Sequence, residues 1–141
     1  MDDIRDADDW RPNSHWAIVS DPKADVAVIA ERIGVGDAIP LHIHRIDEVI
    51  LFLSGNATER VGDETFGVSA GDIVVVPAGQ IHGTRNTGEV EVEIRAVFPS
   101  ARIDMRYVER NPAPGTEGDA PRPGVVWDMR TGAVEPLDDQ G

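Results

Sequence analysis

The feature that most constrains the fold is a succession of short apolar runs, rich in Val and Ile, that Gly, Pro, Asp and Asn interrupt from residue 16 to residue 98. Runs of this kind, bounded by turn-forming residues roughly every 8–12 positions, are typical of antiparallel β-strands. No segment offers an amphipathic helix of useful length. The sequence therefore predicts an all-β domain with strands at 16–19, 26–33, 41–44, 48–54, 57–61, 64–68, 73–77, 81–86 and 90–98.

The length of 141 residues suits a single domain flanked by two irregular arms. Residues 1–15 are predicted to form an acidic N-terminal arm, residues 16–100 the β-domain, and residues 101–141 a C-terminal extension rich in Pro and Gly. Within the extension, residues 125–129 are apolar enough to dock onto the body or onto a second subunit, and we favour docking.

Composition excludes several classes of protein. The chain has no cysteine, so any metal must be held by nitrogen and oxygen rather than thiolate. A net charge of −13 argues against nucleic acid as a partner, because phosphate binding needs clustered Lys and Arg. The acidic N-terminus resembles no signal peptide, and no apolar run approaches the length of a membrane span. We therefore expect a cytoplasmic protein with no membrane partner.

Three histidines and one glutamate form a candidate ligand set: His42, His44, Glu48 and His82. Imidazole and carboxylate are ligands of transition metals. Because residues two apart in a strand face the same side, His42 and His44 point together. A bend at Pro77 and Gly79 is predicted to return His82 over that pair.

The strand that starts at Glu48 predicts a partly apolar pocket beside the ligands. Ile50 and Phe52 share the face of the Glu48 carboxylate, which favours a ring-bearing substrate over a very small polar one. The alternate residues 49, 51 and 53 are expected to pack against another layer of the domain.

Ten positions in two stretches resemble the two conserved motifs of the cupin superfamily. The first stretch supplies Gly36, His42, His44, Glu48 and Gly55, and the second supplies Gly71, Pro77, Gly79, His82 and Asn86. The resemblance covers about residues 26–98. It implies a small β-barrel, the double-stranded β-helix or jelly roll, in which His42, His44, Glu48 and His82 bind one divalent metal inside the mouth. It also implies that Asn86 is structural and that the protein is a homodimer.

Two enzyme functions and one non-enzymatic function follow from such a site. Three imidazoles and a carboxylate leave a divalent ion with a charge of about +1 and open positions for a chelating enolate, catecholate, diketone or carboxylate. The ion is Fe, Mn, Ni, Zn, Co or Cu. We favour a dioxygenase; the alternatives are a metal-assisted polyketide cyclase, isomerase or lyase, with Glu48 as a candidate base, and a small-molecule-binding cupin without activity.

Overall fold

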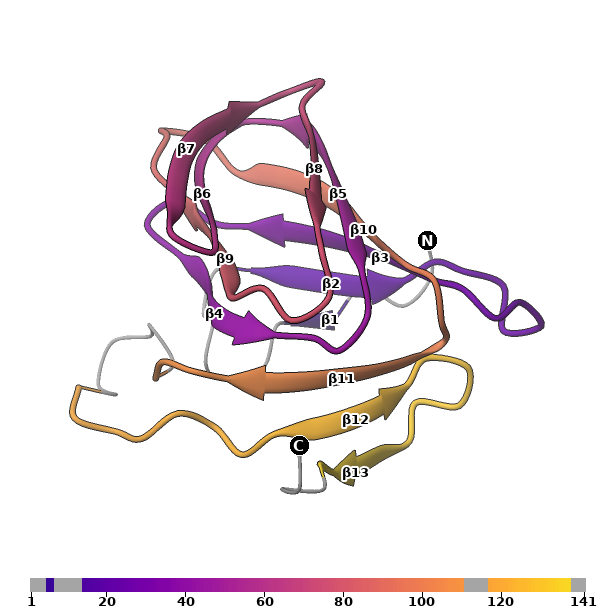
Figure 1. Cartoon of the computed structure of the whole chain (residues 1–141). Coiled ribbons are helices and arrows are strands. Elements are labelled where there is room, and N and C mark those ends of the chain that lie inside the picture. Colours follow the sequence, from indigo (N-terminus) through magenta and orange to yellow (C-terminus); the bar gives the residue numbers. More distant parts are fainter. Residues whose placement is uncertain (1–4, 7–13, 111–116, 138–141) are drawn as a thin grey trace.

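The computed structural model describes residues 5–6, 14–110 and 117–137, which form two antiparallel sheets (Figure 1). Most of the predicted N-terminal arm lies outside the described residues. One sheet contains, in spatial order, β1 (Arg5–Asp6), β2 (His15–Ile18), β3 (Ala27–Ile33), β10 (Val92–Phe98), β5 (Glu48–Ser54) and β8 (Ile73–Val76). The other contains β13 (Val134–Pro136), β12 (Val125–Asp128), β11 (Arg102–Tyr107), β4 (Ala38–Ile43), β9 (His82–Asn86), β6 (Asn56–Val61) and β7 (Glu64–Ser69).

The all-β prediction is confirmed, and each predicted strand between residues 16 and 98 is present with ends shifted by a few positions. The described part of the chain contains no helix that could cross a membrane. Two apolar clusters fill the space between the sheets. One surrounds Phe52 and Ile94, and the other surrounds Trp16, Phe98 and Ile103.

The strands β11, β12 and β13 were not predicted. In β11 charged residues alternate with apolar ones, and β12 and β13 are short, so none of them forms a continuous Val/Ile run. They form because β11 pairs with β4 and then serves as a template for β12 and β13. In Figure 1 these three strands lie side by side below β4.

Alternate residues of β5 face opposite sides of its sheet, as period-two strand geometry requires. Glu48, Ile50 and Phe52 are buried, as predicted. The prediction that Leu53 packs against another layer is wrong, because its side chain is 45% exposed. Val49 and Leu51, on the same face of β5, are half-buried, and Leu53 at the end of the strand faces solvent.

The turn between β8 and β9 is hydrogen-bonded to the turn between β4 and β5. The amide of Gly79 donates to the carbonyl of His44 at 2.8 Å. The amide of Ala78 donates to Oδ1 of Asp47, also at 2.8 Å. These two bonds join the first sequence motif to the second, and they hold His82 beside the histidines of β4.

Gly55 ends β5 in a backbone conformation that only glycine adopts readily, with φ of 86°. A Cβ atom added there would lie 2.7 Å from the carbonyl oxygen of Glu91 and 2.9 Å from Cα of Val92. Both are backbone atoms at the start of β10, so neither can move without distorting that strand.

We expect Gly55→Ala to destabilise the fold more than Gly71→Ala. Gly71 also has a positive φ, of 95°, but a Cβ there would meet nothing within 4 Å. Gly71→Ala should cost about 1 kcal/mol of unfolding free energy for the backbone conformation alone, and Gly55→Ala about 2 kcal/mol more for the clash. Urea unfolding of both variants measures the difference, and equal losses would contradict this account.

Candidate metal centre

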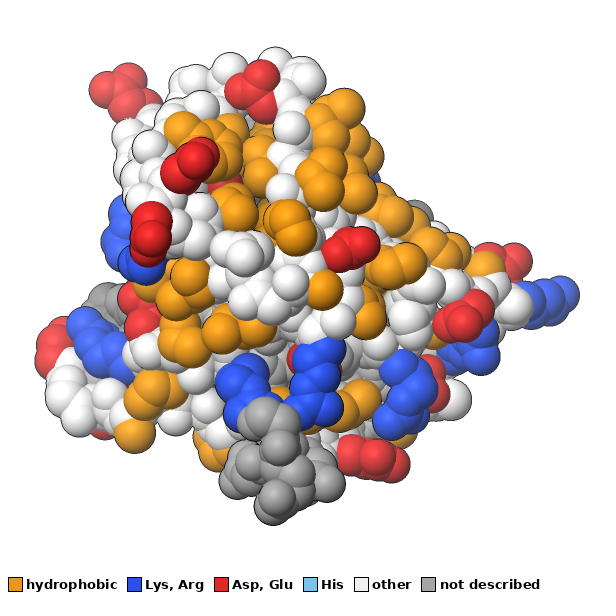
Figure 2. Space-filling model, viewed as in Figure 1, with side chains coloured by type: hydrophobic (Ala, Val, Ile, Leu, Met, Phe, Trp, Pro, Cys, Tyr) orange, Lys and Arg blue, Asp and Glu red, His pale blue; other side chains and the backbone are white. Residues whose placement is uncertain are grey.

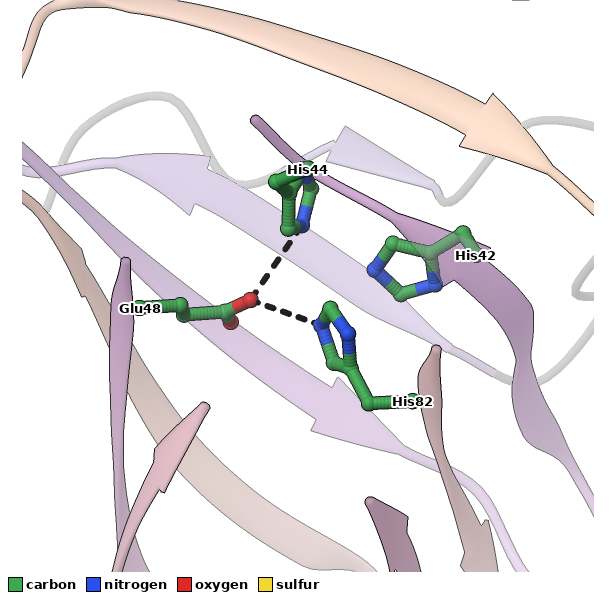
Figure 3. Close-up of side chains that lie close together, drawn as sticks. All are labelled: His42, His44, Glu48 and His82. Carbon is green, nitrogen blue, oxygen red and sulfur yellow. Dashed lines mark hydrogen bonds and ion pairs between the residues drawn. The ribbon is translucent and has the colours of Figure 1, made fainter. Parts of the chain in front are cut away.

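The four predicted ligands come together at one end of the space between the sheets. His42 near the end of β4 lies opposite His82 at the start of β9 in the strand register. His44 follows two residues after His42, and Glu48 begins β5. One potential ligand atom from each side chain lies within 4.8 Å of all the others, and all four residues are buried. Figure 3 shows the carboxylate of Glu48 directed at His44 and His82.

Backbone carbonyls orient the three imidazole rings. Nδ1 of His42 lies 2.6 Å from the carbonyl oxygen of Pro40, and Nδ1 of His44 lies 2.6 Å from that of Asp104. Nδ1 of His82 lies 3.2 Å from the carbonyl oxygen of Gln80. A carbonyl only accepts, so each Nδ1 carries the hydrogen and each neutral ring keeps its Nε2 lone pair for another partner.

That arrangement leaves a deficit of positive charge at the centre. Nε2 of His82 lies 2.8 Å and Nε2 of His44 lies 3.2 Å from the same oxygen of Glu48. Beyond that contact, Nε2 of His44 has no hydrogen-bond partner among the described residues. If both rings are neutral, the Nε2 lone pairs of His44 and His82 face the negatively charged Glu48 carboxylate. Only a proton or a cation placed between these atoms can stabilise that arrangement. The four side chains therefore fit a divalent metal bound by three Nε2 atoms and one carboxylate oxygen.

The pKa values of these groups differ because their surroundings differ. Burial, together with the neighbouring His82 and His44, lowers the pKa of His42 well below 6.5. Burial alone would also lower the pKa of His44, but its contacts with Glu48 and Asp104 together outweigh burial and raise it. Burial alone would raise the pKa of Glu48, but the contacts with His44 and His82 lower it to about 2. Glu48 is therefore ionised across the physiological range and is a weak base.

A cavity of about 630 Å³ opens onto the four ligands. Its walls are mainly apolar and include the rings of Trp16, Phe98, Tyr107 and Trp127. Trp16 and Trp127 pack edge to face with centroids 4.8 Å apart, so β2 and β12 together close one side. Polar groups on the wall outside the ligand set include Glu31, Thr84 and Arg122.

Of the two predicted pocket residues, the structure places one on the cavity wall. Ile50 lines the cavity. Phe52 lies two positions farther along β5 and belongs instead to the apolar cluster around Ile94. Most of the wall was missed by the sequence analysis, because Met105, Tyr107 and Trp127 come from strands that were not predicted.

A model of the cupin domain matches residues 30–98, and this part of the chain is a cupin domain. A comparison with curated protein sequences finds no significant match. The cluster of three histidines and one glutamate is thus a candidate metal site within a cupin domain.

Three solved structures illustrate the shared fold. The cupin domain of Cnp3 from Schizosaccharomyces pombe has 17% identity and a TM-score of 0.58, with 62% of this chain and 64% of that chain covered. KdgF from Halomonas sp. has 22% identity and a TM-score of 0.59, with 69% and 86% covered. Oxalate decarboxylase from Lactobacillus farciminis, in a formate complex, has 23% identity and a TM-score of 0.61, with 70% and 31% covered. This chain thus spans less than two thirds of the Cnp3 domain and about a third of the decarboxylase.

We expect metal affinity to fall as the pH is lowered. Binding requires deprotonated imidazoles. Because the pKa of His44 is raised, protons begin to compete with the metal for its ring at a pH above 6.5. Glu48, with a pKa of about 2, stays ionised and adds no dependence in this range. Calorimetric titration with Zn²⁺ should show at least about tenfold weaker binding at about pH 5.5 than at about pH 8.

The control for this titration is His15→Ala, which removes a histidine outside the cluster. Its pH profile should match that of the unmodified protein, whereas His82→Ala should lose binding at every pH. Binding of equal strength across the pH range would show that the imidazoles are not the ligands.

Proposed function

We propose that this protein is a metal-dependent enzyme that acts on a hydroxylated aromatic or enolic compound. The observation that carries the proposal is the large, mainly apolar cavity that opens onto the three histidines and Glu48. A volume of about 630 Å³ lies in the range of sites for drug-sized ligands. A substrate as small as the formate bound to the decarboxylase relative would leave most of it unfilled.

One group of residues would bind the metal, and another would contact the substrate. His42, His44, His82 and Glu48 would hold one divalent ion, which when bound supplies a Lewis-acidic centre for adjacent substrate oxygens. The aromatic wall would stack against the rings of the substrate and exclude water. Arg122 on the wall supplies a positive charge suited to an acidic substituent.

Dioxygenase chemistry is the favoured reaction. Four protein ligands leave two positions at a six-coordinate ion, one for a substrate oxygen and one for dioxygen. The low pKa of Glu48 disfavours its use as a base and supports its role as a permanent ligand. A cyclase, isomerase or lyase remains the second candidate, because a second buried carboxyl group, Glu59, lies behind the cavity wall within electrostatic reach of His82 and Glu48.

We expect dioxygen uptake when the protein, loaded in turn with Fe, Mn, Ni or Cu, is supplied with flavonols, catechols or β-diketones. An oxygen electrode measures the rate. His82→Ala should lower it by more than about a hundredfold, and His15→Ala should leave it unchanged. Product formation at an undiminished rate without dioxygen would reject the dioxygenase and favour the non-redox alternative. Substrate binding without product formation under any condition would favour a binding protein.

A second copy of the chain is the proposed protein partner. The outer face of the strands β5 and β8 presents Leu53, Ile73 and Val75, which are 45%, 63% and 60% exposed. Figure 2 shows apolar side chains gathered over these strands. β8 is also the edge of its sheet. A contiguous exposed apolar patch at a sheet edge is typical of an interface. A symmetric dimer would bury this patch on both copies of the chain.

We expect the double variant Ile73→Lys/Val75→Lys to be a monomer. Two buried charges facing their symmetry mates should weaken a dimer by at least about tenfold. Sedimentation at micromolar concentration measures the mass. Val90→Lys replaces a comparably exposed valine between β9 and β10 and is the control. A monomeric parent protein, or a double variant that stays dimeric, would contradict this interface.

A further inference from the structure

A second carboxylic acid is completely buried near the ligands. Glu59 on β6 has no exposed surface. One of its oxygens, Oε1, lies 2.5 Å from Oγ1 of Thr84, and the other, Oε2, has no hydrogen-bond partner among the described residues. Burying an ionisable group with an unpaired oxygen costs stability, and an apolar residue would fill the same space more favourably. Glu59 therefore lowers the stability of the fold, and packing alone does not explain why a glutamate occupies this position.

Thr84 stands between Glu59 and the cavity. The two residues are directly paired between β6 and β9, and Thr84 lies two positions after His82 on the same face of its strand. Thr84 lines the cavity. Its hydroxyl group has one hydrogen and two lone pairs, so donating the hydrogen to Glu59 leaves the lone pairs able to accept from a ligand hydroxyl.

We propose that Thr84 and Glu59 form a proton relay that accepts the hydroxyl proton of a phenol or enol bound in the cavity. The ligand hydroxyl passes its proton to Oγ1 of Thr84, while the proton of Thr84 passes to Oε1 of Glu59. The products are a ligand oxyanion, an intact Thr84 hydroxyl and an uncharged Glu59. Thr84 contacts the ligand, and Glu59 acts through it as a positioning residue. The substrate class of this relay rests on the proposed function.

The surroundings of Glu59 match this role. Burial raises its pKa to about 8, against a smaller opposing effect of the hydrogen bond with Thr84. The charged groups that act on it are His82 of β9, which lowers the pKa, and Glu48 of β5, which raises it. Its register partner on β7 is the uncharged Phe66. With this pKa, Glu59 is ionised and able to accept a proton mainly above about pH 8. Its carboxylate is then far closer in basicity to a phenol, with a pKa of about 10, than Glu48 is.

The test follows the ionisation of a coloured phenolic probe, 4-nitrocatechol, bound to the Zn²⁺-loaded protein. Its absorption spectrum reports its protonation state across a pH series. In Thr84→Val and Glu59→Gln, the midpoint for ionisation of the bound probe should lie about one pH unit higher than in the unmodified protein. Thr84→Ser keeps the hydroxyl group and should restore the original midpoint. Elemental analysis should show equal zinc in all variants.

Several outcomes would overturn the relay. If all four proteins share one midpoint, the pair has only a structural role, since such a role alters stability without moving the probe. A Thr84→Ser midpoint equal to that of Thr84→Val would also reject it. If Glu59→Gln fails to fold, the valine and serine variants still decide the question.

A measurement on the metal-free protein separates this inference from the proposed function. In ¹³C spectra of protein labelled at glutamate side chains, Glu59 should titrate well above the other carboxyl groups, and titration together with them would reject the relay. Failure of the probe to bind, or equal binding to His82→Ala, would instead reject the proposed function and the relay's substrate with it, whatever Glu59 does.

Discussion

Two hydrogen bonds between turns hold the functional part of this molecule together. The amides of Ala78 and Gly79 donate to Asp47 and to the carbonyl of His44, so that the loop before β9 is fixed on the loop after β4. The pairing of β9 with β4 and β6 sets the register of His82, and this contact fixes the loop that leads into it. Hydrogen bonds from backbone amides thus join the two sequence motifs. Side-chain substitutions in the cavity would leave these amides in place.

Backbone groups also decide the chemistry of the ligands. A carbonyl oxygen cannot be ionised and cannot donate, so a ring that donates Nδ1–H to it presents Nε2 to the centre. The same centre is then rich in lone pairs and poor in hydrogens. This imbalance separates the roles of the two buried glutamates. Contacts with His44 and His82 keep Glu48 ionised, whereas burial favours the protonated form of Glu59.

The sequence predicted the parts of the structure that depend on local pattern. Strands rich in Val and Ile, the four ligands and the turn glycines follow from spacing and residue type. The strands after residue 98 were missed because they lack the continuous Val and Ile runs of the earlier strands, although β11 does alternate charged and apolar residues as a half-buried strand does. Glu59 and Thr84 were also missed, since they are neighbours only through the register of β6 and β9, and nothing in either segment alone marks the pair.

The edge-to-face contact between Trp16 and Trp127 joins strands that lie outside residues 30–98, the part of the chain shared with other cupins. The shared domain carries the ligands, and the flanking strands carry much of the wall around them. The candidate metal site and much of the cavity wall therefore lie in separate stretches of the sequence. Substitutions in the strands at the two ends of the chain can therefore reshape the cavity without altering the cluster of three histidines and Glu48.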